Sequence, residues 1–168
     1  MNAQPASVSS QSKEFDNVKR LPILISMIIG AFFTILNETL LNVAFPQLMI
    51  ELNVTPSTLQ WLSTGYMLVV AVLIPASALL VQWFTTRQVF IGAMVVFTFG
   101  TLVSAIAPGF SILLMGRLLQ AAGTGLMMPV LMNTILLLYP PEKRGAAMGS
   151  IGLVIMFAPA IGPTLSGI

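Results

Sequence analysis

Two ionisable side chains, Glu38 and Arg117, lie deep within long apolar stretches of this sequence. Gln120 follows Arg117 by three residues, which places both on one face of a helix. A charge at membrane depth is costly, so it normally faces a protein interior or a watery cavity and has a partner there. A membrane-embedded carboxylate can bind a proton or a cation, but hardly both at once, which is the minimum requirement for exchange transport. The alternative for Arg117 is that it extends from a helix end to the membrane surface.

Uncharged side chains near these two residues could complete a polar path. Asn37, Asn42 and Gln120 offer hydrogen-bonding groups. Met127 and Met128 could form an adaptable apolar wall, although methionines at helical spacing are more often ordinary packing residues. The sequence contains no His and no Cys, which excludes a Ser–His triad, disulfides and Cys/His metal sites. We therefore expect no metal site, no cofactor and no enzymatic activity.

Composition defines the kind of fold that must position these residues. Of the 168 residues, 57% are hydrophobic and 7% are charged, and the mean hydropathy is +0.96. Such values are typical of integral membrane proteins, and the scattered basic residues form no face for nucleic acid. Residues 1–20 are polar and predict a disordered tail. The apolar runs, each long enough for a hydrocarbon core of about 30 Å, predict an all-α membrane bundle with helices at about 21–43, 57–81, 89–107, 111–139 and 145–168.

The segments between these runs predict four connections. Residues 45–56 are expected to form a loop that contains Pro46, residues 82–88 a tight turn, residues 108–109 (Pro-Gly) a turn, and residues 140–144 a charged turn. Trp61 and Tyr66 lie toward the start of the second helix and suit a membrane interface. The third helix shows almost no distinguishing side chains.

The basic residues of the tail and the connections predict an orientation. With the N-terminus in the cytoplasm, they all fall on the inner side: Lys13, Lys19, Arg20, Arg87, Lys143 and Arg144. The outer connections contain no Lys or Arg. This is a complete positive-inside bias, so we expect a multi-pass plasma-membrane protein with a cytoplasmic N-terminus.

Depth along the predicted helices brings the two charges to a common level. Glu38 lies about 26 Å along the first helix at 1.5 Å per residue, and Arg117 lies roughly 9 Å below the outer face. In a core of about 30 Å, both fall in the outer third. We therefore predict that Glu38 and Arg117 face the same cavity, either directly paired or bridged by water.

The fifth helix has the composition of a packing helix. Small residues are frequent in its first half, from Gly145 to Gly152. Pro159 and Pro163 are four residues apart, so both fall on nearly the same face and can bend the helix. Gly162 and Gly167 add further smooth surface.

Three motifs occur in order and in register. Residues 36–46 read LNETLLNVAFP, residues 117–125 read RLLQAAGTG, and residues 159–167 read PAIGPTLSG. They resemble the helix-one, helix-four and helix-five signatures of the major facilitator superfamily. Within it they are similar to the fourteen-helix drug–proton antiporters of the lincomycin-resistance and quaternary-ammonium exporter type. The resemblance implies that the chain is the first five helices of such a transporter.

The sequence departs from the family pattern at several positions. The helix-one acid of the family aligns with Asn37, and the carboxylate here is one position later, at Glu38, which turns it by about 100° around the helix. In the motif between helices two and three, only Leu80 and Arg87 fit, and Gln82 replaces an Asp. Ala121 and Ser166 stand for glycines, which are mild changes between small residues.

The resemblance implies proton-driven export of a lipophilic or cationic small molecule by alternating access. Arg117 would then assist proton transfer at Glu38, and Pro159, Gly162, Pro163 and Gly167 would belong to the antiporter motif. The expected partners are the substrate, protons, membrane lipids and the remainder of a transporter. Transporters of this superfamily contain two repeat-related halves. Five helices do not complete even one six-helix half, so they predict a fragment, a truncated frame or one piece of a split protein. The alternative is a small five-helix membrane protein that acts as an oligomeric or partner-binding subunit without transport of its own.

Overall fold

The computed structural model describes residues 20–166, which form five α-helices joined by short turns, without any strand. The helices are α2 (Arg20–Glu51), α3 (Pro56–Trp83), α4 (Thr86–Ala105), α5 (Phe110–Leu138) and α6 (Pro141–Ser166). All five are long and apolar enough to cross a membrane. The predicted all-α membrane bundle is therefore confirmed. The predicted tail lies outside the described residues, except for Arg20, which begins α2.

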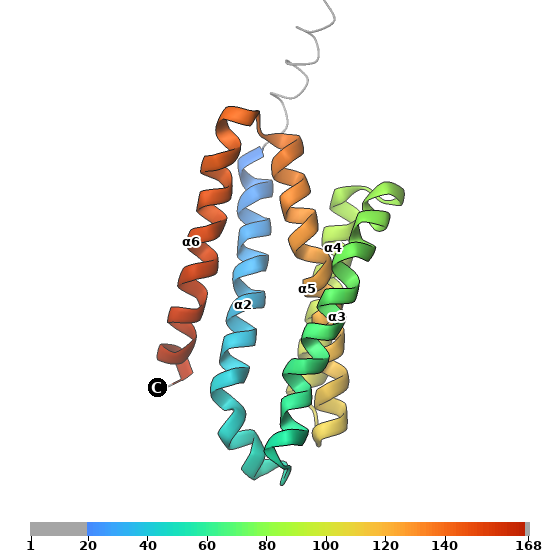
Figure 1. Ribbon diagram of the computed structural model, residues 1–168, viewed down its shortest axis with the longest axis vertical. Helices are drawn as coiled ribbons and strands as arrows, with labels where there is room; N and C mark the ends of the chain where they lie inside the picture. Colours follow the sequence, from blue (N-terminus) through green and yellow to red (C-terminus); the bar gives the residue numbers. More distant parts are fainter. Residues whose placement is uncertain (1–19, 167–168) are drawn as a thin grey trace, which may run out of the picture.

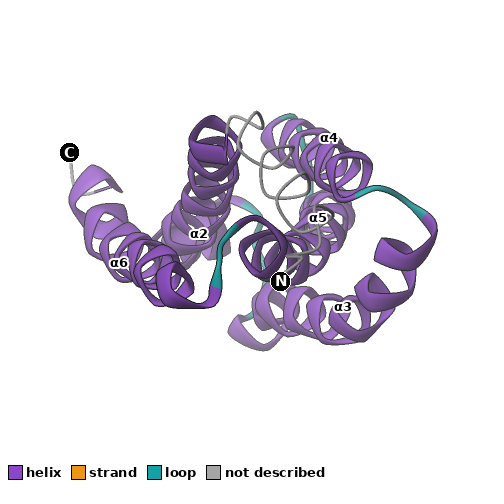
Figure 2. Cartoon of the chain, turned by 90° about the horizontal axis from the view of Figure 1, so that it is seen from above, coloured by secondary structure: helices purple, strands orange, loops and turns teal. Residues whose placement is uncertain are grey.

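Helix α5 lies at the centre of the arrangement and contacts all the other helices, most extensively α4 and α3. Helix α5 packs against α4 and α3 on one side of the bundle, whereas α6 packs mainly against α2 at the opposite edge (Figure 2). The start of α2, the α3–α4 turn and the α5–α6 turn lie at one end of the molecule (Figure 1). Arg87, Lys143 and Arg144 consequently share that end.

The predicted loop at residues 45–56 was wrong, because α2 continues through Pro46 to Glu51. Leu41, Phe45 and Leu48 pack against an apolar cluster formed by Leu59, Leu62 and Leu113. This burial favours continuing the helix past the proline, which neighbouring helices allow in a membrane bundle. The actual connection is only four residues long and places Asn53 at a positive φ of 50°.

The turns after α3 and after α5 are also shorter than the sequence predicted. Only Phe84 and Thr85 separate α3 from α4, and Thr85 and Gln88 form a capping box that starts α4. Helix α6 begins at Pro141, so the predicted charged turn is largely its first helical turn. There Arg144 donates hydrogen bonds to the carbonyl oxygens of Leu136 (2.8 Å) and Tyr139 (3.0 Å) and so caps the end of α5.

Glycines let α5 approach α4 closely. A Cβ at Gly123 would lie 2.6 Å from the Ala93 carbonyl oxygen, and one at Gly100 would lie 2.7 Å from the Gly116 carbonyl oxygen. Because these neighbours are backbone atoms, only glycine fits at the crossing. The close contact fixes the rotation of α5 and therefore the direction in which its polar side chains point.

Candidate functional site

Arg117 lies in the first half of α5 and is buried among the helices, with only 3% of its surface exposed. Its Nη1 donates hydrogen bonds to Asn37 Oδ1 on α2 (3.1 Å) and to Gln120 Oε1 on its own helix (2.8 Å). The alternative that Arg117 extends from a helix end to the membrane surface is therefore wrong. Burial of a guanidinium requires such partners, because it has lost its hydration.

Gln120 connects Arg117 to α4. Its amide oxygen accepts from Arg117, and its amide nitrogen donates to Thr101 Oγ1 at 2.9 Å. The Thr101 hydroxyl in turn donates to the Phe97 carbonyl oxygen. Since Gln120 is 1% exposed and both ends of its amide are bonded, its orientation is fixed.

Helix α3 closes the site with an aromatic ring. The Cζ atom of Arg117 lies 4.6 Å from the centre of the Tyr66 ring, a cation–π distance. The Tyr66 hydroxyl donates to Thr124 Oγ1 at 2.7 Å, and Thr124 donates to the Gln120 carbonyl oxygen at 3.0 Å. Tyr66 was predicted to lie at the membrane interface, which is wrong, since only 4% of its surface is exposed.

The direct ion pair between Glu38 and Arg117, one of two predicted alternatives, is not formed among the described residues. Arg117 contacts Asn37, the position of the family's acid, rather than Glu38. The one-residue offset rotates the carboxylate away by about 100°. Glu38 is half-buried and directly follows Asn37 on α2, so it lies close to the same cluster. A water bridge between Glu38 and Arg117 stays a prediction.

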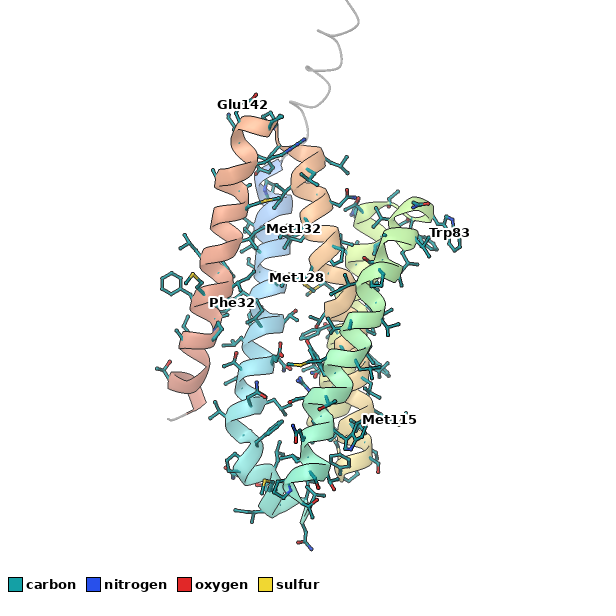
Figure 3. All side chains as sticks on the ribbon, viewed as in Figure 1. Phe32, Trp83, Met115, Met128, Met132 and Glu142 are labelled. Atoms are coloured by element: carbon teal, nitrogen blue, oxygen red, sulfur yellow. The ribbon has the colours of Figure 1, made fainter. Side chains whose placement is uncertain are left out.

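The other predicted path residues have different surroundings. Asn42 is exposed and lies outside the hydrogen-bonded cluster. Met127 is 1% exposed and packs with Met27, Ala31 and Leu131, which agrees with the packing alternative. Met128 is half-buried and is drawn between α2 and α5 in Figure 3.

The antiporter-motif residues lie on α6, away from Arg117. Gly162 is buried against α2, where a Cβ would meet the methyl carbon of Thr39 at 2.5 Å. Pro159 is exposed, and α6 runs continuously through Pro159 and Pro163 to Ser166. Gly167 lies outside the described residues.

Arg87 lies at the other end of the bundle from the Arg117 cluster. It is exposed in the first turn of α4 and lines a cavity of about 630 Å³ between the start of α2, the start of α4 and the end of α5. Apolar side chains, including Met27, Phe90 and Leu137, form most of the wall. The structure therefore does not bring Arg87 together with the predicted coupling residues.

Three residues of the cluster were not predicted from the sequence, namely Tyr66, Thr101 and Thr124. Each is a hydroxyl-bearing residue within an apolar run, and such a residue needs a partner at membrane depth. The sequence contained that signal, but Ser and Thr also bond to their own helix backbone, as Thr34 and Thr134 do. Thr101 and Thr124 make such a backbone bond as well. Only the packing of the helices brings their hydroxyl groups to Gln120 and Tyr66.

The arrangement can hold a positive charge next to α2 and respond to the charge of a nearby carboxylate. Arg117 Nε has no hydrogen-bond partner within the described chain and lies buried. An unused donor is costly in such surroundings, so the cluster is not fully satisfied as it stands. Among the described residues, no group of three or more His, Cys, Asp or Glu side chains could hold a metal ion.

Comparisons with known proteins agree with this geometry. The family described as Major Facilitator Superfamily matches residues 27–168. The MFS-type transporter YhcA of Bacillus subtilis is 56% identical over 92% of this chain, and the lincomycin resistance protein LmrB of the same organism is 53% identical over 96%. The putative multidrug resistance protein MdtD of Yersinia pseudotuberculosis is 35% identical over 82%. No solved structure matches the chain.

The chain covers about a third of the length of these relatives, namely 29% of YhcA, 34% of LmrB and 30% of MdtD. The described helices accordingly correspond to the first part of a transporter bundle. With a family match over most of its residues and five helices able to span a membrane, the chain belongs to the major facilitator superfamily.

Proposed function

We propose that this chain supplies the first five helices of a proton-coupled exporter of lipophilic or cationic small molecules in the plasma membrane. The observation that carries the proposal is the buried guanidinium of Arg117, held toward α2 beside Asn37 and Glu38. A fixed positive charge at membrane depth requires a functional or structural counterpart. Helix α2 contains two acidic residues, Glu38 and Glu51. Glu38 directly follows Asn37, which contacts Arg117, so Glu38 is the nearer of the two to the guanidinium.

Glu38 is the proton carrier in this mechanism, and Arg117 controls its charge. When Glu38 is ionised, the guanidinium stabilises the carboxylate. When Glu38 binds a proton, that attraction is lost, and the guanidinium keeps its hydrogen bonds to Asn37 and Gln120 and its contact with the Tyr66 ring. A cationic substrate would compete with the proton for the same carboxylate, which couples the two movements in opposite directions.

The relatives support export of small molecules as the transported class. One is named for lincomycin resistance and another for multidrug resistance. A half-buried carboxylate suits a cationic compound, and the apolar walls of the bundle suit a lipophilic one. This is the reason for proposing a lipophilic or cationic substrate rather than a sugar or an anion.

The orientation proposed here places the N-terminus in the cytoplasm. The end of the bundle that carries the start of α2 also carries Arg87, Lys143 and Arg144 (Figure 1). Among the described residues, the turns at the opposite end contain no Lys or Arg. The positive-inside rule assigns the basic end to the cytoplasm.

The test is drug transport into everted vesicles that carry the protein expressed from its complete reading frame. We expect Glu38→Gln to abolish the response of transport to an imposed proton gradient. Glu51→Gln is the matched control, because Glu51 is exposed at the end of the same helix, where its carboxylate accepts a hydrogen bond from Gln47. Gradient-driven transport by Glu38→Gln at the level of the control would remove Glu38 from the mechanism.

A second candidate function is a five-helix subunit that binds a partner or its own copies. The observation in its favour is that nothing lies within 4 Å of a Cβ built at Gly145, Gly149 or Gly152 of α6. Small-residue faces of this kind commonly pack against another helix. A discrete oligomer in detergent, with no drug transport, would favour this second function over the exporter.

A further inference from the structure

The Arg117 guanidinium lies over the face of the Tyr66 ring, which belongs to a third helix, α3. Its ring centre lies 4.6 Å from Arg117 Cζ, and the ring is almost fully buried. The hydrogen-bond donors of a guanidinium lie in its plane, whereas its faces cannot donate. Asn37 and Gln120 occupy part of the edge, so Tyr66 provides a different kind of contact from theirs.

The tyrosine hydroxyl ties the ring to α5. It donates to Thr124 Oγ1 at 2.7 Å, and Thr124 donates to the carbonyl oxygen of Gln120 at 3.0 Å. The side chain of Gln120 is at the same time an edge partner of Arg117. Two turns of α5 therefore restrain both the ring that contacts the guanidinium and the amide that holds its edge.

We propose that Tyr66, held in place by Thr124, is a positioning residue that directs the edge of the Arg117 guanidinium toward Asn37 and Glu38 on α2. Because the ring packs against the guanidinium, it limits how far the side chain can turn toward α3. The Nε donor, which has no hydrogen-bond partner among the described residues, stays buried within the cluster. The proposal extends the proposed function, because it concerns the charge that acts on Glu38. It is testable without transport.

A single engineered thiol can report the charge at Glu38. The sequence contains no cysteine, so Glu38→Cys provides the only thiol of the chain. A thiolate is the reactive form, and a nearby positive charge favours it. The pH at which alkylation by a small maleimide reaches half of its maximal rate therefore measures how strongly Arg117 acts on this position. The sample is the full-length protein in detergent, with any cysteine outside these 168 residues replaced by serine.

We expect Arg117→Gln, combined with Glu38→Cys, to raise this half-rate pH by about one unit, and Tyr66→Leu to raise it by at least half as much. Tyr66→Phe and Thr124→Val should give the same, smaller increase, because both keep the ring and remove only its anchor. If Tyr66→Leu leaves the half-rate pH unchanged while Arg117→Gln raises it, Tyr66 does not position the guanidinium. If Arg117→Gln itself has no effect, the guanidinium does not act on Glu38 and the proposal also fails.

Two controls keep the result interpretable. A thiol introduced by Asn53→Cys, in the exposed α2–α3 turn, should show one half-rate pH in all backgrounds. If Tyr66→Leu does not fold, the near-isosteric Tyr66→Phe and Thr124→Val decide, and the absence of any increase in both overturns the proposal. Because no transport is measured, failure of this test is distinct from failure of the proposed exporter function, which depends on Glu38→Gln.

Discussion

Helices α5 and α6 both carry glycines at short intervals, but their surroundings are opposite. On α5, a Cβ at Gly116 would meet backbone atoms of Ser104 and Gly100, and one at Gly123 would meet Ala93 and Phe97. On α6, Gly145, Gly149 and Gly152 have open space where a Cβ would lie. Helix α5, whose glycines touch a neighbouring helix, also carries the buried polar cluster around Arg117. Helix α6, whose Gly145, Gly149 and Gly152 face open space, takes part in none of the hydrogen bonds described for that cluster. Close backbone contact is therefore what fixes the polar side chains in this bundle.

The largest effect should follow from filling the α4–α5 contact. Gly123→Ala places a methyl group 2.6 Å from the Ala93 carbonyl oxygen, so the helices must separate. We expect the free energy of unfolding to fall by about 3 kcal/mol, with loss of the hydrogen bond between Gln120 and Thr101. Reversible unfolding in mixed detergent micelles measures this. Unchanged stability would show that α4 and α5 are not held by backbone contact.

A smaller effect is expected at the one closed glycine described on α6. Gly162→Ala brings a methyl group to 2.5 Å from the methyl carbon of Thr39, which is a side-chain atom that can shift. We expect a loss of about 1–2 kcal/mol in the same unfolding assay. Thr39→Ser removes that methyl carbon but keeps the Cβ atom at 2.9 Å, so the double variant should recover part of the loss. A Gly162→Ala effect as large as that of Gly123→Ala would erase the distinction between the two interfaces.

The connection between the two regions gives a third prediction. Arg144→Ala removes two hydrogen bonds to carbonyl oxygens at the end of α5, and we expect it to cost about 1 kcal/mol. Lys143→Ala is the matched control, since Lys143 is exposed in the same turn. Equal unfolding midpoints for the two variants would mean that the cap contributes nothing to stability.

The smallest effect, of opposite sign, is expected at the open glycines. Gly149→Ala adds a methyl group to open space and removes a residue that disfavours helix, so stability should rise by up to about 1 kcal/mol. The same unfolding assay measures this change in the free energy of unfolding, on protein that has no added partner. A clear loss of stability would indicate that this face of α6 is covered by another helix in the intact protein.

Much of the bundle could be predicted from the amino-acid pattern. The five membrane-crossing runs are long apolar segments, and length and hydropathy alone identify them. The boundaries were less accurate, because burial of Phe45 and Leu48 carries α2 past a proline that would end a helix in water. The pairing of Arg117 with Gln120 could also be predicted from the sequence, because two residues that are three positions apart on one helix are neighbours whatever the rest of the chain does.

The partners of Arg117 on other helices depend on three-dimensional packing. Asn37 and Glu38 are adjacent in sequence, and only the rotation of α2 relative to α5 decides which of them meets the guanidinium. The sequence by itself determined a membrane bundle with a buried charge, because hydrophobicity and local helix geometry are properties of short segments. The tertiary structure alone decided that Asn37, Tyr66 and Thr101 surround that charge. It also decided that the glycines of α5 touch a neighbouring helix, whereas Gly145, Gly149 and Gly152 of α6 face open space. Helix rotation and contact distance depend on all neighbouring side chains at once, and no single segment specifies them.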